Sequence, residues 1–238
     1  MNIQYSVVIP LKNEEENVQD LLDELEPVMS SIQKPWEVLC IDDGSTDRTL
    51  EILRSIASKK PWLRILAFDK NYGQSSAFDA GFKAARGEYI LTLDGDRQND
   101  PQDIPRLVKE ADSCDMVCGR RINRQDTWIK KITSYFANQI RSRVCHDGIQ
   151  DTGCSLKLYK AESLRKIKMF QGMHRFLPAL FLIEGLKIKE IPVSHRERVR
   201  GKTKYNFFNR SFNTIADMMA VRWMHKRRLT YRIESEMP

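Results

Sequence analysis

The chain has 238 residues, 41% of them hydrophobic, which is enough to bury one sizeable core. Its 39 Lys and Arg residues outnumber its 32 Asp and Glu residues, and the net charge of +7 favours anionic partners such as nucleic acid, lipid headgroups or phosphorylated substrates. The longest apolar run, FLPALFLI, is far shorter than the roughly 20 residues of a membrane-spanning helix, and the start MNIQYSVVIP has no signal-peptide pattern. The five cysteines show no CxxC pairing, so we expect reduced thiols in a cytoplasmic protein that is soluble or attached to a membrane surface.

Short apolar runs alternate with longer amphipathic runs in the first half of the chain. Runs rich in Val, Ile, Leu, Tyr and Phe predict buried strands at residues 5–10, 36–42, 63–68, 89–94 and 115–119. Between them, apolar residues at helical spacing predict helices at residues 14–32, 45–58 and 73–86. This alternation predicts an α/β fold with a mostly parallel central sheet and helices on both of its faces.

The second half of the chain is less regular. We expect helices at residues 126–144 and 174–186, a strand at 187–195 and a basic loop that begins at residue 196. A further helix from Tyr205 to Met224 carries one apolar stripe, which consists of Phe208, Phe212, Ile215, Met219 and Trp223. Such a stripe is more often buried in a core, but a helix that lies in a membrane interface fits the same pattern. We therefore divide the chain into an α/β domain over residues 1–205 and an amphipathic, basic C-terminal segment over residues 206–238.

Acidic residues follow three of the predicted parallel strands. Glu14 comes after the first strand, Asp42 and Asp43 after the second, and Asp94 and Asp96 after the run YILTL. Ligands of open α/β sheets bind outside the carboxyl ends of the strands, so these carboxylates are expected to converge there. Asp94 and Asp96 suit Mg²⁺ or Mn²⁺ held jointly with the phosphates of a ligand. Taken alone, a DGD tripeptide is more often a polar turn, but three acidic strand ends in one half-sheet favour a site.

Several segments, in order and spacing, resemble the family 2 glycosyltransferases. They are SVVIPLKNEEENV, IDDGSTDRT, DKNYGQSSAFDAGFKAARGEYILTLDGDRQNDP, DTGCSLKLYK and HRERVRGKTKY. Within that family the chain is most similar to the polyprenyl-phosphate glycosyltransferases, the group that includes dolichyl-phosphate mannosyltransferase. The resemblance runs from about Ile3 to Trp223. It implies a GT-A (Rossmann-like) fold, a nucleotide-sugar donor, a divalent metal and inversion at the anomeric carbon.

The resemblance also implies a set of donor-binding residues. These are Pro10 and Glu14 in the nucleotide pocket, Asp42 and Asp43 by the base and ribose, Asp94 and Asp96 at the ribose, metal and diphosphate, Gln98 beside the sugar, and Arg198 and Lys204 in a loop over the diphosphate. Two positions depart from the family pattern. Lys12 stands where relatives often carry an aromatic residue that stacks on the base, which leaves UDP and GDP equally open. Thr203 replaces the usual serine of the RxxGxSK loop and keeps its hydroxyl group.

The acceptor side is expected to be cationic, because a polyprenyl phosphate must approach a site that is already anionic. By position, Arg121 matches the phosphate-contacting arginine of the family, and Lys130 stands where relatives often have a second arginine. The alternative for both is a solvated basic face. Asp151 matches the acidic residue near the acceptor, where transfer to a hydroxyl group needs a general base. Because a phosphate acceptor is already ionised, Asp151 would orient groups more than remove a proton; otherwise it is a turn or helix cap.

The sequence thus predicts a metal-dependent, inverting glycosyltransferase that moves a sugar from a UDP- or GDP-sugar to an undecaprenyl or dolichyl phosphate. Asp96, Asp151 and Arg121 are its expected catalytic residues. We expect a peripheral enzyme on the cytoplasmic face of the membrane that finds the bilayer by surface contact or through an integral membrane partner. Two alternatives remain: transfer to a saccharide or other hydroxyl acceptor, and a non-catalytic sugar-nucleotide-binding subunit. Nucleic-acid binding is not expected, because the positive charge gathers late in the chain without a reading motif.

Overall fold

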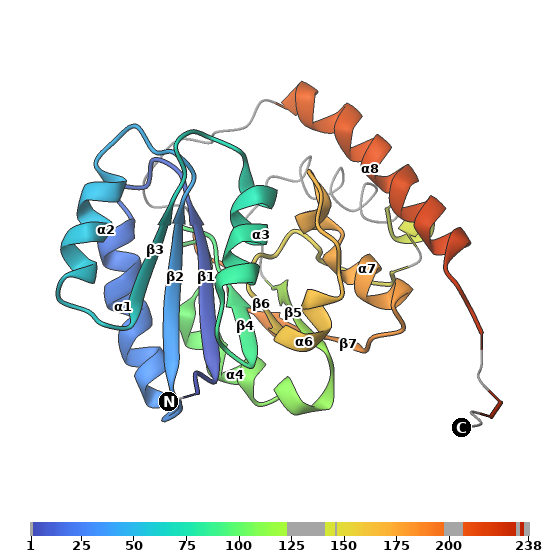
Figure 1. Ribbon diagram of the computed structural model, residues 1–238, viewed down its shortest axis with the longest axis horizontal. Coiled ribbons are helices and arrows are strands. Elements are labelled where there is room, and N and C mark those ends of the chain that lie inside the picture. The colour runs from blue at the N-terminus through green and yellow to red at the C-terminus, as the bar shows by residue number, and fades with distance from the viewer. Residues whose placement is uncertain (1, 123–140, 146, 198–206, 232–233, 236–238) are drawn as a thin grey trace.

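The computed structural model describes residues 2–122, 141–145, 147–197, 207–231 and 234–235, with only the backbone described over 207–213. Its sheet has seven strands in the order β3-β2-β1-β4-β6-β5-β7 (Figure 1). They are β1 (Tyr5–Leu11), β2 (Trp36–Asp42), β3 (Leu63–Ala67), β4 (Tyr89–Thr92), β5 (Met116–Arg121), β6 (Lys157–Lys160) and β7 (Ile188–Val193). The helices are α1 (Val18–Ser31), α2 (Thr49–Ala57), α3 (Gln74–Ala84), α4 (Ile104–Val108), α6 (Ala161–Arg165), α7 (Leu177–Ile183) and α8 (Phe207–Arg227), with 3₁₀ turns η1 (Pro101–Asp103), η2 (Ala111–Ser113) and η3 (Met173–Arg175).

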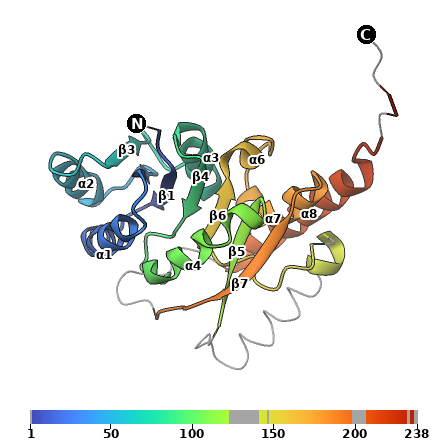
Figure 2. The same cartoon turned by 90° about the horizontal axis from the view of Figure 1, so that it is seen from below.

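Helices cover both faces of the sheet, as the strand–helix alternation predicts. Helices α1, α2 and α4 pack on one face around a first cluster of buried apolar side chains. Helices α3, α6, α7 and α8 pack on the other face around a second cluster, and Figure 2 shows the two layers from below. Helix α3 approaches β1 closely, because a Cβ atom at Gly81 would lie 2.4 Å from Val8 Cγ1. The start of α3 is thereby fixed over the end of the sheet that carries the acidic residues.

The strand β6 is antiparallel to both of its neighbours, whereas the other paired strands run parallel. Its first residue, Lys157, is paired with Thr92 at the end of β4. Because β6 runs in reverse, the segment that precedes it lies at the carboxyl edge of the parallel strands. The segment DTGC, residues 151–154, therefore comes to the same edge as the turn after β4.

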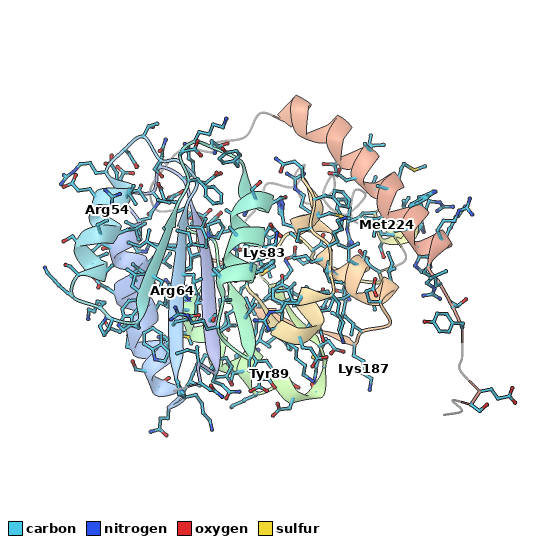
Figure 3. All side chains as sticks on the ribbon, in the orientation of Figure 1. Arg54, Arg64, Lys83, Tyr89, Lys187 and Met224 are labelled. Atoms are coloured by element: carbon cyan, nitrogen blue, oxygen red, sulfur yellow. The ribbon has the colours of Figure 1, made fainter. Side chains whose placement is uncertain are left out.

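Helix α8 crosses the outside of the molecule next to α7 (Figure 1). Its inner side packs on the second cluster through Val221, Met218 and Met224, the last of which Figure 3 labels. Its outer side exposes Ile215, Met219 and Trp223, whose exposed fractions are 55%, 57% and 64%. The predicted apolar stripe is therefore at the surface wherever its side chains are described. Across the described part of the chain, no helix combines the length and the apolar character that crossing a bilayer requires.

Candidate active site

Three of the predicted carboxylates meet at the carboxyl edge of the sheet. Asp42 ends β2, Glu14 follows β1, and Asp94 follows β4. The turn after β4 packs directly against β1, because a Cβ atom at Gly95 would lie 2.4 Å from Leu11 Cδ2 and 3.3 Å from Glu14 Cγ. Any side chain at Gly95 would push the turn away from β1. This close approach explains why a glycine separates the two aspartates of DGD.

The turn that carries Asp94 and Asp96 is closed by its own hydrogen bonds. The backbone N–H of Asp94 donates to Asn99 Oδ1 at 3.2 Å, and the backbone N–H of Gln98 donates to Asp96 Oδ1 at 3.2 Å. Gln74, the first residue of α3, donates from Nε2 to Asp94 Oδ1 at 3.0 Å. Groups within the turn and on α3 thus hold the two carboxylates at one place.

The two aspartates form an electrostatically strained pair. Burial, followed by the negative charge of Asp96, raises the pKa of Asp94 to about 6, although the nearby Ser155 hydroxyl group and the charges of Lys157 and Arg121 oppose the shift. Among the described residues, no three His, Cys, Asp or Glu side chains are grouped so that they could hold a metal ion by themselves. Two neighbouring carboxylates that repel each other are the kind of oxygen ligands that Mg²⁺ or Mn²⁺ takes together with phosphate oxygens.

The two aspartates after β2 differ in their partners. Both oxygens of Asp43 accept hydrogen bonds from the next loop: from Asn71 Nδ2 at 2.9 Å and from the backbone N–H groups of Tyr72 and Gly73 at 2.7 and 2.9 Å. Asp42 is 1% exposed, and no group in the described residues donates a hydrogen bond to its Oδ1 atom. Asp43 thus shapes the loop, whereas the Oδ1 atom of Asp42 is buried without a hydrogen-bond donor among the described residues.

The remaining residues expected around the nucleotide lie beside these aspartates. Pro10 lies in β1, after the residues of that strand that pair with β4. Proline has no N–H group to donate, but at this position it interrupts no hydrogen bond between β1 and β4. Glu14 accepts a hydrogen bond at Oε2 from Asn17 Nδ2 at 2.7 Å. Lys12 donates from Nζ to the carbonyl oxygen of Gly44, so this cation is tied to the loop after β2.

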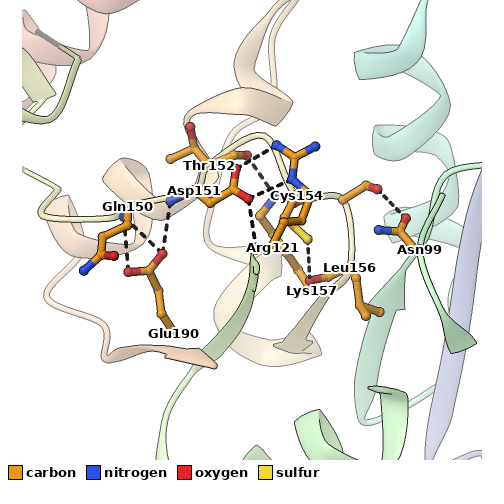
Figure 4. Close-up of polar contacts among 10 residues, drawn as sticks. Asn99, Arg121, Gln150, Asp151, Thr152, Cys154, Leu156, Lys157 and Glu190 are labelled. Atoms are coloured by element: carbon orange, nitrogen blue, oxygen red, sulfur yellow. Dashed lines mark hydrogen bonds and ion pairs between the residues drawn. The ribbon is translucent and has the colours of Figure 1, made fainter. Parts of the chain in front are cut away.

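Arg121 and Asp151 form a bidentate ion pair at the end of β5 (Figure 4). Arg121 donates to Asp151 from Nε at 2.7 Å, from the second guanidinium nitrogen at 2.8 Å and from the backbone N–H at 3.1 Å. The Arg121 side chain is 16% exposed and that of Asp151 is 8% exposed. Glu190 on β7 accepts hydrogen bonds from the backbone N–H groups of Gln150 and Asp151. Arg121 thus presents a fixed, nearly buried guanidinium group whose Nε and one terminal nitrogen face Asp151.

Lys157 at the start of β6 holds the segment that contains Asp151. The lysine is 4% exposed, and its Nζ donates to the carbonyl oxygens of Thr152, at 3.2 Å, and of Cys154 (Figure 4). The neighbouring Ser155 donates from Oγ to Asn99 Oδ1 at 2.6 Å, which connects this segment to the turn after β4. Sequence reasoning missed Lys157, because a lysine in so short a strand carries no signal of burial.

Three predicted phosphate-binding cations, Lys130, Arg198 and Lys204, lie outside the described residues. Arg196 precedes Arg198 and Lys204 in the sequence and is among the described residues. Its backbone N–H donates to the carbonyl oxygen of Gln98 at 2.9 Å. The start of the basic loop therefore lies against the turn after β4, although the roles of its cations stay predictions.

Comparison with known proteins agrees with this geometry. A structure of glucosyl-3-phosphoglycerate synthase from Mycobacterium tuberculosis, in complex with Mn²⁺ and UDP-glucose, superposes with a TM-score of 0.71 over 92% of this chain and 79% of that one, at 20% identity. The chain thus has the GT-A fold.

Two curated relatives are closer in sequence. Dodecaprenyl-phosphate galacturonate synthase of Rhizobium johnstonii is 38% identical in an alignment that covers 92% of this chain and 67% of the relative. Undecaprenyl-phosphate 4-deoxy-4-formamido-L-arabinose transferase of Pectobacterium carotovorum is 39% identical over 90% of this chain and 66% of its own length. The chain thus spans about two thirds of these relatives. The family model "Glycosyl transferase family 2" matches residues 6–168, and the chain belongs to this family.

Proposed function

We propose that the protein transfers a sugar from a nucleotide-diphosphate sugar to a polyprenyl phosphate, with Mg²⁺ or Mn²⁺ at Asp94 and Asp96. The observation that carries this proposal is the place of the Arg121–Asp151 pair. Its guanidinium lies at the same sheet edge as the carboxylates, close enough to oppose the pKa shift of Asp94. This arrangement supports a role for Arg121 in holding the acceptor phosphate beside a metal and a diphosphate. The names of both curated relatives specify a polyprenyl phosphate, dodecaprenyl phosphate in one and undecaprenyl phosphate in the other.

In this proposal an oxygen of the acceptor phosphate attacks the anomeric carbon of the donor sugar. The new bond joins that carbon to the phosphate oxygen, the bond to the nucleotide diphosphate breaks, and the configuration inverts. No proton has to move, because the acceptor is already ionised. Arg121 would hold the attacking phosphate, and Asp151 would fix the direction of its guanidinium. A bound divalent cation would neutralise the charge of the departing diphosphate.

The test uses purified protein, Mn²⁺, undecaprenyl phosphate in detergent and a mixed pool of UDP- and GDP-sugars. The lipid extract is analysed by mass spectrometry for a new lipid whose mass increment identifies the sugar class. Asp96→Asn should abolish the product, whereas the matched control Asp79→Asn should not. Asp79 instead pairs with Lys83, one turn further along α3 and largely exposed.

Each result separates the proposal from its alternatives. A sugar-modified lipid that depends on Asp96 supports the proposal, and the nucleoside diphosphate released with it distinguishes UDP from GDP. Consumption of donor without a modified lipid points to a hydroxyl acceptor, for which Asp151→Asn should abolish activity because Asp151 must then take a proton. Nucleotide binding without turnover of any donor would refute the transferase and favour a sugar-nucleotide-binding subunit.

We also propose that α8 attaches the protein to the cytoplasmic face of a membrane. Ile215, Met219 and Trp223 recur at helical spacing along the exposed side of the helix. The exposed basic residues 226–228 follow at its end and would approach anionic headgroups. The inner side of α8, with Val221 fully buried, holds the helix on the domain.

Liposome sedimentation tests this attachment. Replacing Ile215, Met219 and Trp223 together with Ser should abolish binding to anionic vesicles. The control replaces Ile122 and Phe170, which are 43% and 40% exposed and lie outside α8, and should bind like the parent protein. Equal vesicle binding by the two variants would refute the role of α8. Equal binding of the parent protein to anionic and neutral vesicles would refute the role of the basic residues.

A further inference from the structure

Glu24 on α1 joins two arginines that are far apart in the sequence. Its Oε1 atom pairs with Arg97 in the turn after β4, and its Oε2 atom pairs with Arg196 after β7 at 2.6 Å. The two arginines also have second partners. Arg97 pairs with Asp20 on α1 at 2.5 Å, and Arg196 pairs with Asp100 at 2.7 Å. The five side chains form one ion-pair network beside the carboxylate site.

The network fixes a turn that is conformationally unfavourable. Arg97 follows Asp96 directly and has a φ of +60°, in the left-handed region that side chains other than glycine rarely adopt. The same turn is closed by the hydrogen bond from the Gln98 N–H to Asp96 Oδ1. The side chain of Arg97 is 18% exposed and is anchored twice on α1. Its ion pairs therefore favour the one backbone conformation that places Asp96 where it is.

The network also fixes the chain that leads into the basic loop. Besides its two ion pairs, Arg196 donates its backbone N–H to the carbonyl oxygen of Gln98, and His195 forms an isolated antiparallel bridge with Asn99. Glu24 is the one carboxylate in the described network that contacts both arginines. Its two hydrogen-bonded guanidinium partners lower its pKa although burial acts in the opposite direction. Without its charge, two neighbouring guanidinium groups would lose their shared counterion.

We propose that Glu24 is a positioning residue for the nucleotide donor: through Arg97 and Arg196 it holds the turn that carries Asp96 and the start of the basic loop in one arrangement. This inference rests on the proposed function, because it assigns Asp96 to the metal and diphosphate. Glu24 does not touch the ligand itself. Its effect should therefore appear in donor affinity and in the mobility of residues 94–100, while the overall fold persists.

The test compares Glu24→Gln with Glu26→Gln, a control on the same helix. Glu26 has the same side-chain exposure of 30%, and it binds Lys60 and Trp62, away from the site. The dissociation constants of Mn²⁺–UDP and Mn²⁺–GDP are measured by calorimetry at a temperature at which all variants are folded. Glu24→Gln should weaken binding of the nucleotide that the parent protein prefers about tenfold, which corresponds to about 1.4 kcal/mol. Glu26→Gln should leave this affinity within about a factor of two.

Two further measurements separate positioning from stability. Hydrogen exchange of the free proteins should be faster at residues 94–100 in Glu24→Gln but unchanged there in Glu26→Gln. Arg97→Lys should retain more donor affinity than Arg97→Gln, because it keeps one of the two ion pairs. Equal donor affinity and equal exchange in the two glutamate variants would overturn the inference while the proposed function stands. A parent protein that binds neither nucleotide would overturn the proposed function and this inference with it.

Discussion

Replacing Asp94 with Asn should make the protein more stable at neutral and alkaline pH. The pKa of Asp94 rises from 3.8 to about 6 on folding, so the folded state disfavours the ionised carboxylate. The difference of about 2 pKa units corresponds to at most about 3 kcal/mol of lost stability, at about 1.4 kcal/mol per unit. This cost is absent below the unfolded pKa, where the group is protonated in both states, and it is complete above the folded pKa. Asn has no charge and therefore avoids the cost.

Urea denaturation without metal or nucleotide measures the effect at about pH 8 and about pH 4. Asp94→Asn should raise the free energy of unfolding at the higher pH and change it little at the lower one. Asp115→Asn is the matched control. Burial acts to raise the pKa of Asp115, but hydrogen bonds from the Lys187 N–H and from Ser163 lower it overall, so this change should destabilise the protein near pH 8. An Asp94→Asn protein that is no more stable than the parent there would refute the reasoning.

Three further substitutions test the geometry of the site. Gly95→Ala should lower the free energy of unfolding by about 1–3 kcal/mol, because its Cβ atom would overlap Leu11; an unchanged thermal midpoint would contradict this contact. Arg121→Lys keeps the charge but loses the bidentate pairing with Asp151, so steady-state kinetics should show an acceptor KM raised on the order of tenfold, with the donor KM unaffected. Lys157→Met leaves two buried carbonyl oxygens without their donor and should cost about 1–3 kcal/mol by urea denaturation; parent-like stability would exclude that role.

The sequence predicted much of the sheet, because parallel strands that are buried on both faces read as continuous apolar runs. The predicted strands at the start of the chain all exist, with ends that differ by a few residues. The strand β6 was missed. It has four residues, begins and ends with lysine, and stands between neighbours that run the other way. Lys157 is buried because its ammonium group donates to carbonyl oxygens of the preceding turn. No local sequence pattern predicts these contacts.

The site was predictable where it consists of residues that directly follow strands. Topology brings such residues to one edge, so Asp42 and Asp94 could be grouped without coordinates. Contacts between residues that are distant in the sequence could not be predicted in this way. Glu24 and Arg97 are 73 positions apart, and Glu24 and Arg196 are 172 apart, so their charges look like ordinary surface residues in the sequence. The occupation of the Asp43 oxygens by the 71–73 loop was equally invisible.

The reversed strand β6 also has a consequence for how this protein can be recombined. Among the described strands, β1 to β4 form one parallel unit and β5 to β7 form a second, mixed unit, and the only ladder between them pairs β4 with β6 over four residue pairs. A relative's second unit could be grafted onto this first unit through that short junction, provided that the contacts of residues 98–100 with 195–196 are kept. The Arg121–Asp151 pair would then move as one block together with Arg196, so such a graft would change residues on both the acceptor side and the donor side.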